Sequence, residues 1–140
     1  MTLTEQEIEE FLGQANVAIV ATVGADGQPH AVPTWYEWAD GEIVFHTGVR
    51  TRKYRNIRHN DRVSICVDSK TVPYKAVVVY GRATTEVGTD DERTRRLAIR
   101  YLGEALGTRY ADSLRGTRLV IVRVRPDRII SWDYGRGDNP

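Results

Sequence analysis

Six basic residues are concentrated in the segment 45–64, FHTGVRTRKYRNIRHNDRVS, where Asp61 is the only acid. The segment turns at Gly48 and enters a predicted short helix near Thr51. A helix N-terminus presents unpaired N–H groups and the positive end of the helix dipole, so it attracts anions. The pattern therefore predicts a phosphate-binding turn. Its basic residues are Arg50, Arg52, Lys53, Arg55, Arg58 and Arg62.

Three residues at the start of this helix are the candidates for holding a phosphate. Thr51 can cap the helix and also donate its hydroxyl to the phosphate, while Arg52 and Lys53 add charge in the first turn. Cations at a helix N-terminus are unfavourable for the helix itself. A bound phosphate would reverse that effect. A solvated basic helix face is the alternative interpretation, and the pattern alone leaves both open.

The histidines and the cysteine do not form a recognisable reactive group. His30, His46 and His59 lack metal-ligand spacing, so no metal site is expected. Cys66 lies mid-strand between Ile65 and Val67 and is expected to be a small core residue. The sequence shows no catalytic triad that would include it. No side chain has the pattern of a catalytic acid or base, which suits a reaction whose chemistry is carried by a cofactor.

Two helices are expected to cover the core. Residues 4–7 form a capping box, and the apolar residues that follow at i, i+3 and i+4 predict a short helix that ends near Gly13. Residues 89–92 form a second capping box, which opens a helix that ends near Gly103.

Strands account for most of the remaining chain. Residues 17–23, 30–38 and 43–47 are separated by turns and predict two consecutive hairpins in a meander. Further strands are expected at 62–68, 75–85 and 119–124, the last broken by Pro126, with a possible seventh at 128–132. Gly81 suggests a bulge or bend.

This order of elements predicts the fold class. Six or seven short antiparallel strands with two covering helices favour a closed or nearly closed barrel. The strands lie too close together in sequence for the helical crossovers of a parallel sheet. A chain of 140 residues is the usual size of one domain, so residues 1–140 are expected to form one.

Composition narrows the function classes. The net charge of +1 disfavours a nucleic-acid-binding module. No apolar run reaches about 18 residues, and from the acidic, polar start we expect neither a signal peptide nor a transit peptide. With one cysteine there is no internal disulfide, which suits a reducing compartment, so we expect a cytoplasmic location away from membranes.

Several motifs resemble one known superfamily. The sequences 45–47 (FHT), 51–53 (TRK) and 60–64 (NDRVS) resemble the flavin-binding core of the pyridoxamine-phosphate-oxidase-like split barrels. The run 53–57 is similar to the Lys-x-x-Asn-Leu motif of the deazaflavin-dependent members, the flavin/deazaflavin oxidoreductase B group. The resemblance spans residues 15–133 and implies a homodimeric split β-barrel.

The resemblance also implies a cofactor site. The strand through Pro33 would lie against a flat flavin-like ring, and the 51–53 turn would hold the phosphate. A lysine from the neighbouring subunit would reach the ring. The residues implied as cofactor-binding are Pro33, Thr34, Trp35, His46, Thr47, Thr51, Arg52, Lys53, Asn56 and Lys75.

Two departures from the superfamily pattern direct the choice of cofactor. Ala31 stands where the oxidases have an Arg that meets the FMN phosphate, and the C-terminal sequence SWDYGRGDNP lacks their Arg-x-His substrate motif. We therefore expect coenzyme F-420, an 8-hydroxy-5-deazaflavin, rather than FMN. Arg50, Arg55 and Arg58 could hold its polyglutamate tail.

The function expected from these observations is an F-420-dependent reductase. It would transfer a hydride to a conjugated, electron-poor small molecule. An FMN-dependent oxidoreductase of the same fold is the alternative, as is a non-catalytic protein that binds flavin or haem.

Overall fold

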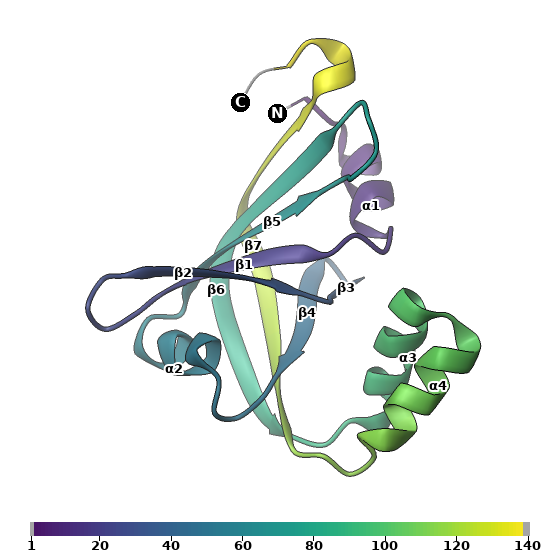
Figure 1. The fold of residues 1–140 in the computed structure, drawn as a ribbon. Helices are drawn as coiled ribbons and strands as arrows, with labels where there is room; N and C mark the ends of the chain where they lie inside the picture. The colour runs from purple at the N-terminus through teal and green to yellow at the C-terminus, as the bar shows by residue number, and fades with distance from the viewer. Residues whose placement is uncertain (1, 139–140) are drawn as a thin grey trace.

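The computed structural model describes residues 2–138 (Figure 1). In this part of the chain, seven strands form one antiparallel sheet, which confirms the mainly β split-barrel prediction. The strands are β1 Ala18–Val23, β2 Pro29–Thr34, β3 Glu37–Ala39, β4 Glu42–Thr47, β5 Arg62–Asp68, β6 Lys75–Gly88 and β7 Leu119–Asp133. The helices are α1 Glu5–Leu12, α2 Arg52–His59, α3 Asp91–Leu102, α4 Glu104–Ser113 and the 3₁₀ turn η1 Tyr134–Arg136.

The strand order corrects the meander prediction. The order is β2-β1-β5-β6-β7-β4-β3, so β2 and β3, which follow one another in the chain, lie at opposite edges of the sheet. Trp35 and Tyr36 separate these two strands, and the Tyr36 ring is fully buried, with its hydroxyl donating to the Leu12 carbonyl at 2.9 Å. Because two residues join the two edges, the sheet must roll up. Figure 1 shows β1 and β2 running across the long strands β6 and β7.

The two longest strands are bent rather than interrupted. The prediction that Pro126 ends a strand was wrong, because β7 continues to Asp133. Pro126 pairs with Gly81 beside a register shift between Tyr80 and Gly81, which confirms the predicted bulge. A bulge tolerates a proline, which has no N–H to donate. A Cβ at residue 81 would collide with the Arg125 carbonyl oxygen, so glycine is required there.

The first predicted capping box is confirmed and the second is wrong. At α1, the Thr4 hydroxyl accepts from the Glu7 N–H at 3.1 Å and the Glu7 carboxylate accepts from the Thr4 N–H at 3.3 Å. At α3 the cap is Asp90 rather than Thr89, and its carboxylate accepts from the Arg93 N–H at 2.9 Å. A carboxylate one residue later competes successfully for the same orphan donors.

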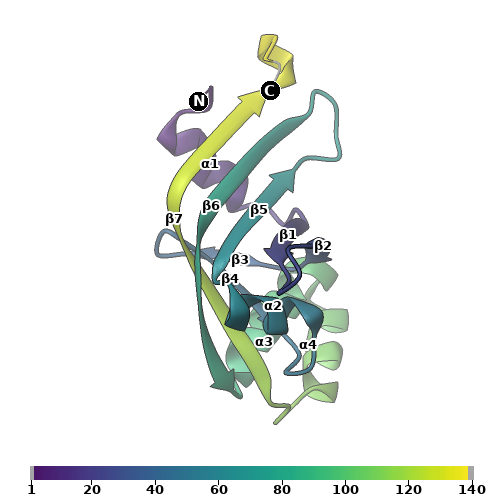
Figure 2. The same cartoon turned by 90° about the vertical axis from the view of Figure 1, so that its left-hand side faces the viewer.

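Helix α4 was not predicted. It begins directly after Gly103, where the chain turns with a φ of 84° and α3 ends. A Cβ at Gly107 would lie 2.5 Å from the Ile99 Cα, so this glycine lets α4 pack closely against α3. The two helices form a hairpin beside the barrel (Figures 1 and 2). None of the helices in residues 2–138 is long and apolar enough to cross a membrane.

Side chains along each strand alternate between an inner, buried face of the sheet and an outer face. On β5, Val63, Ile65 and Val67 point into the core between the rolled sheet and α1. Cys66 lies between two of them and faces outward, half-buried. The prediction of a core cysteine was therefore wrong, because the period-2 pleat places residue 66 on the other face. Burial raises the pKa of the Cys66 thiol.

Candidate functional site

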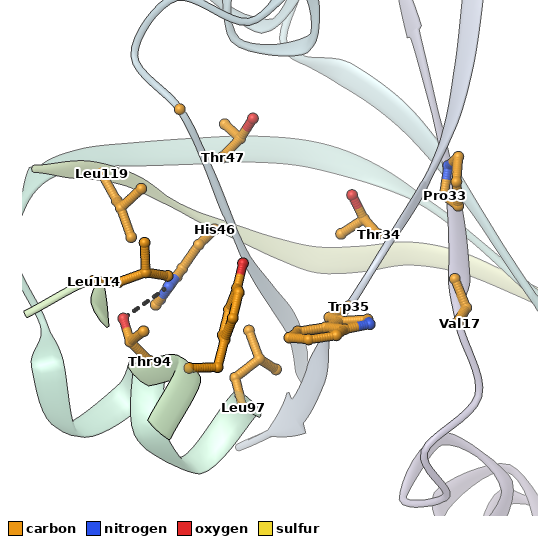
Figure 3. A pocket seen from close by; sticks show the side chains of 12 residues that line it. Val17, Pro33, Thr34, Trp35, His46, Thr47, Thr94, Leu97, Leu114 and Leu119 are labelled. Carbon is orange, nitrogen blue, oxygen red and sulfur yellow. Dashed lines mark hydrogen bonds between the residues drawn. The ribbon is translucent and has the colours of Figure 1, made fainter. Parts of the chain in front are cut away.

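A cavity of about 570 Å³ lies between the barrel and the α3–α4 hairpin (Figure 3). The barrel lines it with Val17, Pro33, Thr34 and Trp35 on one side and with His46, Thr47 and Gly48 at the end of β4. The hairpin and its exit line it with Thr94, Leu97, Tyr110, Leu114 and Leu119. The structure thus brings together five of the residues predicted from the sequence, namely Pro33, Thr34, Trp35, His46 and Thr47.

Lys53 extends from α2 beneath the polar side of this cavity. Its side chain is buried, and Nζ donates to Thr34 Oγ1 at 2.7 Å and lies 5.5 Å from the centroid of the Phe45 ring. Burial lowers the pKa of Lys53. An ammonium has three donors, and within residues 2–138 Nζ makes this one hydrogen bond. Lys53 is therefore a desolvated cation that an anion at this end of the cavity would stabilise.

Thr51 is the N-cap of α2, as predicted. Its hydroxyl accepts from the Tyr54 N–H at 3.2 Å, lies 2.8 Å from the Thr47 hydroxyl and donates to the Gly48 carbonyl at 3.1 Å. The first turn of α2 has no acidic residue. The hydroxyls of Thr47 and Thr51 therefore lie together beside a helix N-terminus whose charge favours an anion.

The other five predicted residues do not line the cavity. Two of them, Thr51 and Lys53, lie beside its polar side, and the remaining three lie elsewhere. Arg52 is exposed on the first turn of α2. Asn56 is buried, and its Nδ2 donates to Thr22 Oγ1 at 3.0 Å, which ties α2 to β1. Lys75 begins β6 opposite Asp133. Asn56 therefore has a structural role within this chain, and Lys75 does not line the cavity.

The His46 side chain reaches from β4 toward α3. Its Nδ1 lies 3.5 Å from Thr94 Oγ1, and that hydroxyl donates to the Asp90 carbonyl at 2.9 Å. Its Nε2 is buried without a hydrogen-bond partner in the described residues. Burial lowers the pKa of His46, and the carboxylate of Asp90 opposes that shift. The imidazole is therefore neutral at pH 7, with its proton best placed on Nδ1.

An aromatic cluster forms another wall. The Trp35 indole stacks on the Tyr101 ring with centroids 5.1 Å apart and planes at 4°, and Tyr110 meets it edge-on at 5.8 Å and 67°. Tyr101 falls within the helix that the sequence predicted to end near Gly103, and Tyr110 was not found because α4 was not predicted. Leu97 lies on the predicted helix α3, but nothing in the sequence placed it beside Trp35 and His46.

Comparison with known proteins found a matching family and a curated relative. The family model for pyridoxamine 5'-phosphate oxidase matches residues 4–133. A 5a,11a-dehydrotetracycline/5a,11a-dehydrooxytetracycline reductase of Streptomyces rimosus is 32% identical over 136 residues, which is 94% of this chain and 84% of the relative.

Two solved structures extend the likeness to three dimensions. A conserved hypothetical protein from Mycobacterium tuberculosis is 30% identical with a TM-score of 0.78, over 100% of this chain and 91% of that chain. An F-420 reductase is 26% identical with a TM-score of 0.70, over 87% of this chain and 94% of that chain. With the sheet order, the rolled barrel and a family match across nearly its whole length, this chain belongs to the pyridoxamine 5'-phosphate oxidase family.

Proposed function

We propose that the protein is an F-420-dependent oxidoreductase that delivers a hydride to a conjugated, electron-poor small molecule. The observation that carries the proposal is the buried Lys53 ammonium beside the N-terminus of α2. Relatives named as a dehydrotetracycline reductase and an F-420 reductase support the reaction class and the coenzyme.

The residues present fit the anionic part of such a coenzyme. Lys53 would supply an ammonium donor, and the α2 N-terminus its free N–H groups. Arg52 is exposed on the same turn, and Arg55 and Arg58 are exposed further along the helix. This basic surface exceeds the needs of one phosphate, which favours a ligand with further carboxylates, such as the polyglutamate tail of F-420.

The rest of the cavity suits the flat part of the ligand. When bound, the reduced coenzyme supplies the hydride. The chain itself contributes mostly apolar walls and the hydroxyls of Thr34 and Thr47, and it places no charged side chain among the lining residues. Walls of this kind can orient flat rings against one another, which is what hydride transfer requires of a protein.

We propose further that the protein is a homodimer. One row of side chains crosses the outer face of five neighbouring strands and is apolar throughout: Pro33, Ile19, Cys66, Val78 and Ile130. Ile19 is 37% exposed in the isolated chain. A second copy would cover this row and bring its own Lys75 near the cavity of the first.

Two measurements test these proposals. Calorimetric titration with F-420 and with FMN should favour F-420, and FMN binding at least tenfold tighter, a gap of about 1.4 kcal/mol, would remove the deazaflavin assignment. Sedimentation at micromolar concentration should give about twice the chain mass of 15.9 kDa. A monomer that binds the coenzyme tightly would exclude a site shared between two chains.

A further inference from the structure

The hairpin end of the cavity differs chemically from the end beside α2. Its lining consists mostly of apolar and aromatic side chains, with Thr94 and Leu97 on α3, Tyr110 on α4, and Leu114 and Leu119 on the segment that returns to the barrel. Figure 3 shows Leu114 and Leu119 beside His46 and Leu97 beside Trp35, away from the hydroxyls of Thr34 and Thr47. A ligand group that enters here loses its water and gains apolar contacts. This end therefore suits an uncharged ring rather than a phosphate.

Trp35 offers this end a flat surface. Tyr101 covers one face of the indole in a parallel stack, yet Tyr101 is not among the residues that line the cavity. Trp35 and Tyr110 both line it. Trp35 therefore meets the cavity on the side away from Tyr101, where Tyr110 also packs against the indole at 67°.

Tyr101 is itself held firmly. Its hydroxyl accepts from the Tyr36 N–H at 3.1 Å and donates to the Asn16 carbonyl at 2.8 Å. These bonds join α3 to the corner between β2 and β3 and to the segment before β1. The orientation of the indole is therefore set by α3 as well as by its own strand.

The neighbouring Arg100 strengthens this attachment. Its guanidinium donates to the carbonyls of Gly13 at 2.9 Å, Leu12 at 3.2 Å and Gln14 at 2.6 Å. Carbonyl groups at the end of a helix have no intrahelical donor, and Arg100 supplies a donor to those at the end of α1. Arg100 thus ties the C-terminal half of α3 to the end of α1, and Tyr101 ties it to Asn16 and Tyr36.

We propose that the acceptor substrate is a planar conjugated ring that stacks on Trp35 at the hairpin end, and that Tyr101 is the positioning residue that holds the indole for it. The proposal rests on the proposed function, in which a second ring must lie beside the coenzyme. A stacked arrangement selects flat molecules over equally apolar globular ones, because only a flat ring contacts the whole indole face.

The first experiment measures shape selectivity by calorimetry. The probes are menadione, a planar quinone, and camphor, a globular ketone of similar size, each titrated into the full-length protein. Menadione should bind more tightly, and Trp35→Leu should lower its affinity about threefold to tenfold while camphor changes less. The matched control is Trp38→Leu, because Trp38 lies outside this cavity and donates to Glu9 at 2.6 Å.

The second experiment separates positioning from general destabilisation. Tyr101→Phe retains the stacked ring and loses the two hydroxyl contacts, whereas Tyr101→Leu loses both. The ratio of menadione to camphor affinity should fall in Tyr101→Leu and be largely rescued in Tyr101→Phe. Melting temperatures and near-ultraviolet circular dichroism show whether each variant is folded. Loss of affinity for both probes in equal proportion would overturn the positioning role.

The outcomes distinguish this proposal from the proposed function. If F-420 binds but Trp35→Leu leaves menadione affinity unchanged, the stacking site is wrong and the coenzyme assignment stands. If F-420 fails to bind while menadione binding depends on Trp35 and on planarity, the ring site stands and the coenzyme is wrong. If saturating F-420 displaces menadione, the indole receives the coenzyme ring, and the acceptor assignment is overturned.

Discussion

Helices α2 and α3 both border the cavity region, but their N-termini are built in opposite ways. The start of α3 is acidic, with Asp90 as the cap and Asp91 and Glu92 in the first turn. The start of α2 is capped by Thr51 and has no acid in its first turn.

The difference separates a helix stabilised by its own sequence from one that gains from a ligand. Carboxylates at α3 complement the helix dipole, and Arg93 also forms an ion pair with Glu37. At α2, Lys53 opposes the dipole and is buried as well. Such an arrangement is unfavourable unless an anion occupies the site, so we expect substitutions at α2 to affect binding and those at α3 to affect stability.

The largest effect is expected for Lys53→Met. Methionine keeps the buried aliphatic stem and removes the charge. A charge-assisted hydrogen bond of about 1.5–3 kcal/mol is lost, so coenzyme affinity should fall about 10- to 150-fold by calorimetry. The melting temperature of the ligand-free protein should stay the same or rise, because a desolvated ammonium is removed.

Arg58→Ala is the control for this variant. Arg58 is exposed in the last turn of α2, with its guanidinium 4.7 Å from the Tyr54 ring centroid. Arg58→Ala should weaken coenzyme binding less than Lys53→Met does. Its effect should be larger for a coenzyme with a long polyglutamate tail than for one with a short tail. Unchanged affinity in Lys53→Met would show that the basic turn is structural.

Asp90→Ala should have the opposite effect to Lys53→Met, because it should lower stability and leave coenzyme binding nearly unchanged. Losing the cap of α3 should lower the free energy of unfolding by about 1 kcal/mol, measured by urea denaturation. Coenzyme affinity should remain within about twofold, since this carboxylate does not line the cavity. Thr51→Val removes the cap of α2 and should lower both quantities. Equal losses of affinity in the two cap variants would contradict the distinction between the helices.

Arg52→Glu makes the start of α2 resemble that of α3. An acid in the first turn should stabilise the ligand-free protein by about 0.3–1 kcal/mol at low salt, and less at high salt. Coenzyme affinity should decrease, because a negative charge then faces the anion site. A fall in ligand-free stability would mean that Arg52 makes a favourable contact in the fold.

The smallest effect concerns pH and His46. Burial lowers its pKa, so below about pH 6.5 the folded state binds fewer protons than the unfolded state. Its stabilising contribution is present above that pH and is lost as the pH falls through the folded pKa. His46→Gln should therefore flatten the loss of melting temperature on the acid side.

The charged groups around His46 sharpen this test. Asp90 raises the pKa of His46, whereas Arg123 and Arg96 lower it. Asp90→Asn should lower this pKa further in an NMR titration of the imidazole. An unchanged or raised pKa would show that the acidic start of α3 does not act on the cavity.

The local features were predictable because they depend on neighbouring residues. The Thr4–Glu7 capping box, the Thr51 cap and the end of α3 at Gly103 each follow from spacings of a few positions. The bulge at Gly81 was predictable because glycine alone fits where another backbone approaches closely. The motifs around 45–64 likewise indicated the family and the polar half of the candidate site.

The tertiary structure decided what depends on contacts distant in sequence. The separation of β2 from β3 to opposite sheet edges requires the burial of Tyr36 against α1. The second half of the cavity exists because Gly107 lets α4 approach α3, and the stack of Tyr101 on Trp35 joins residues 66 positions apart in the chain. Short-range hydrogen-bond and charge patterns are present in the sequence itself, whereas the partner of a buried ring is fixed only when the sheet has rolled.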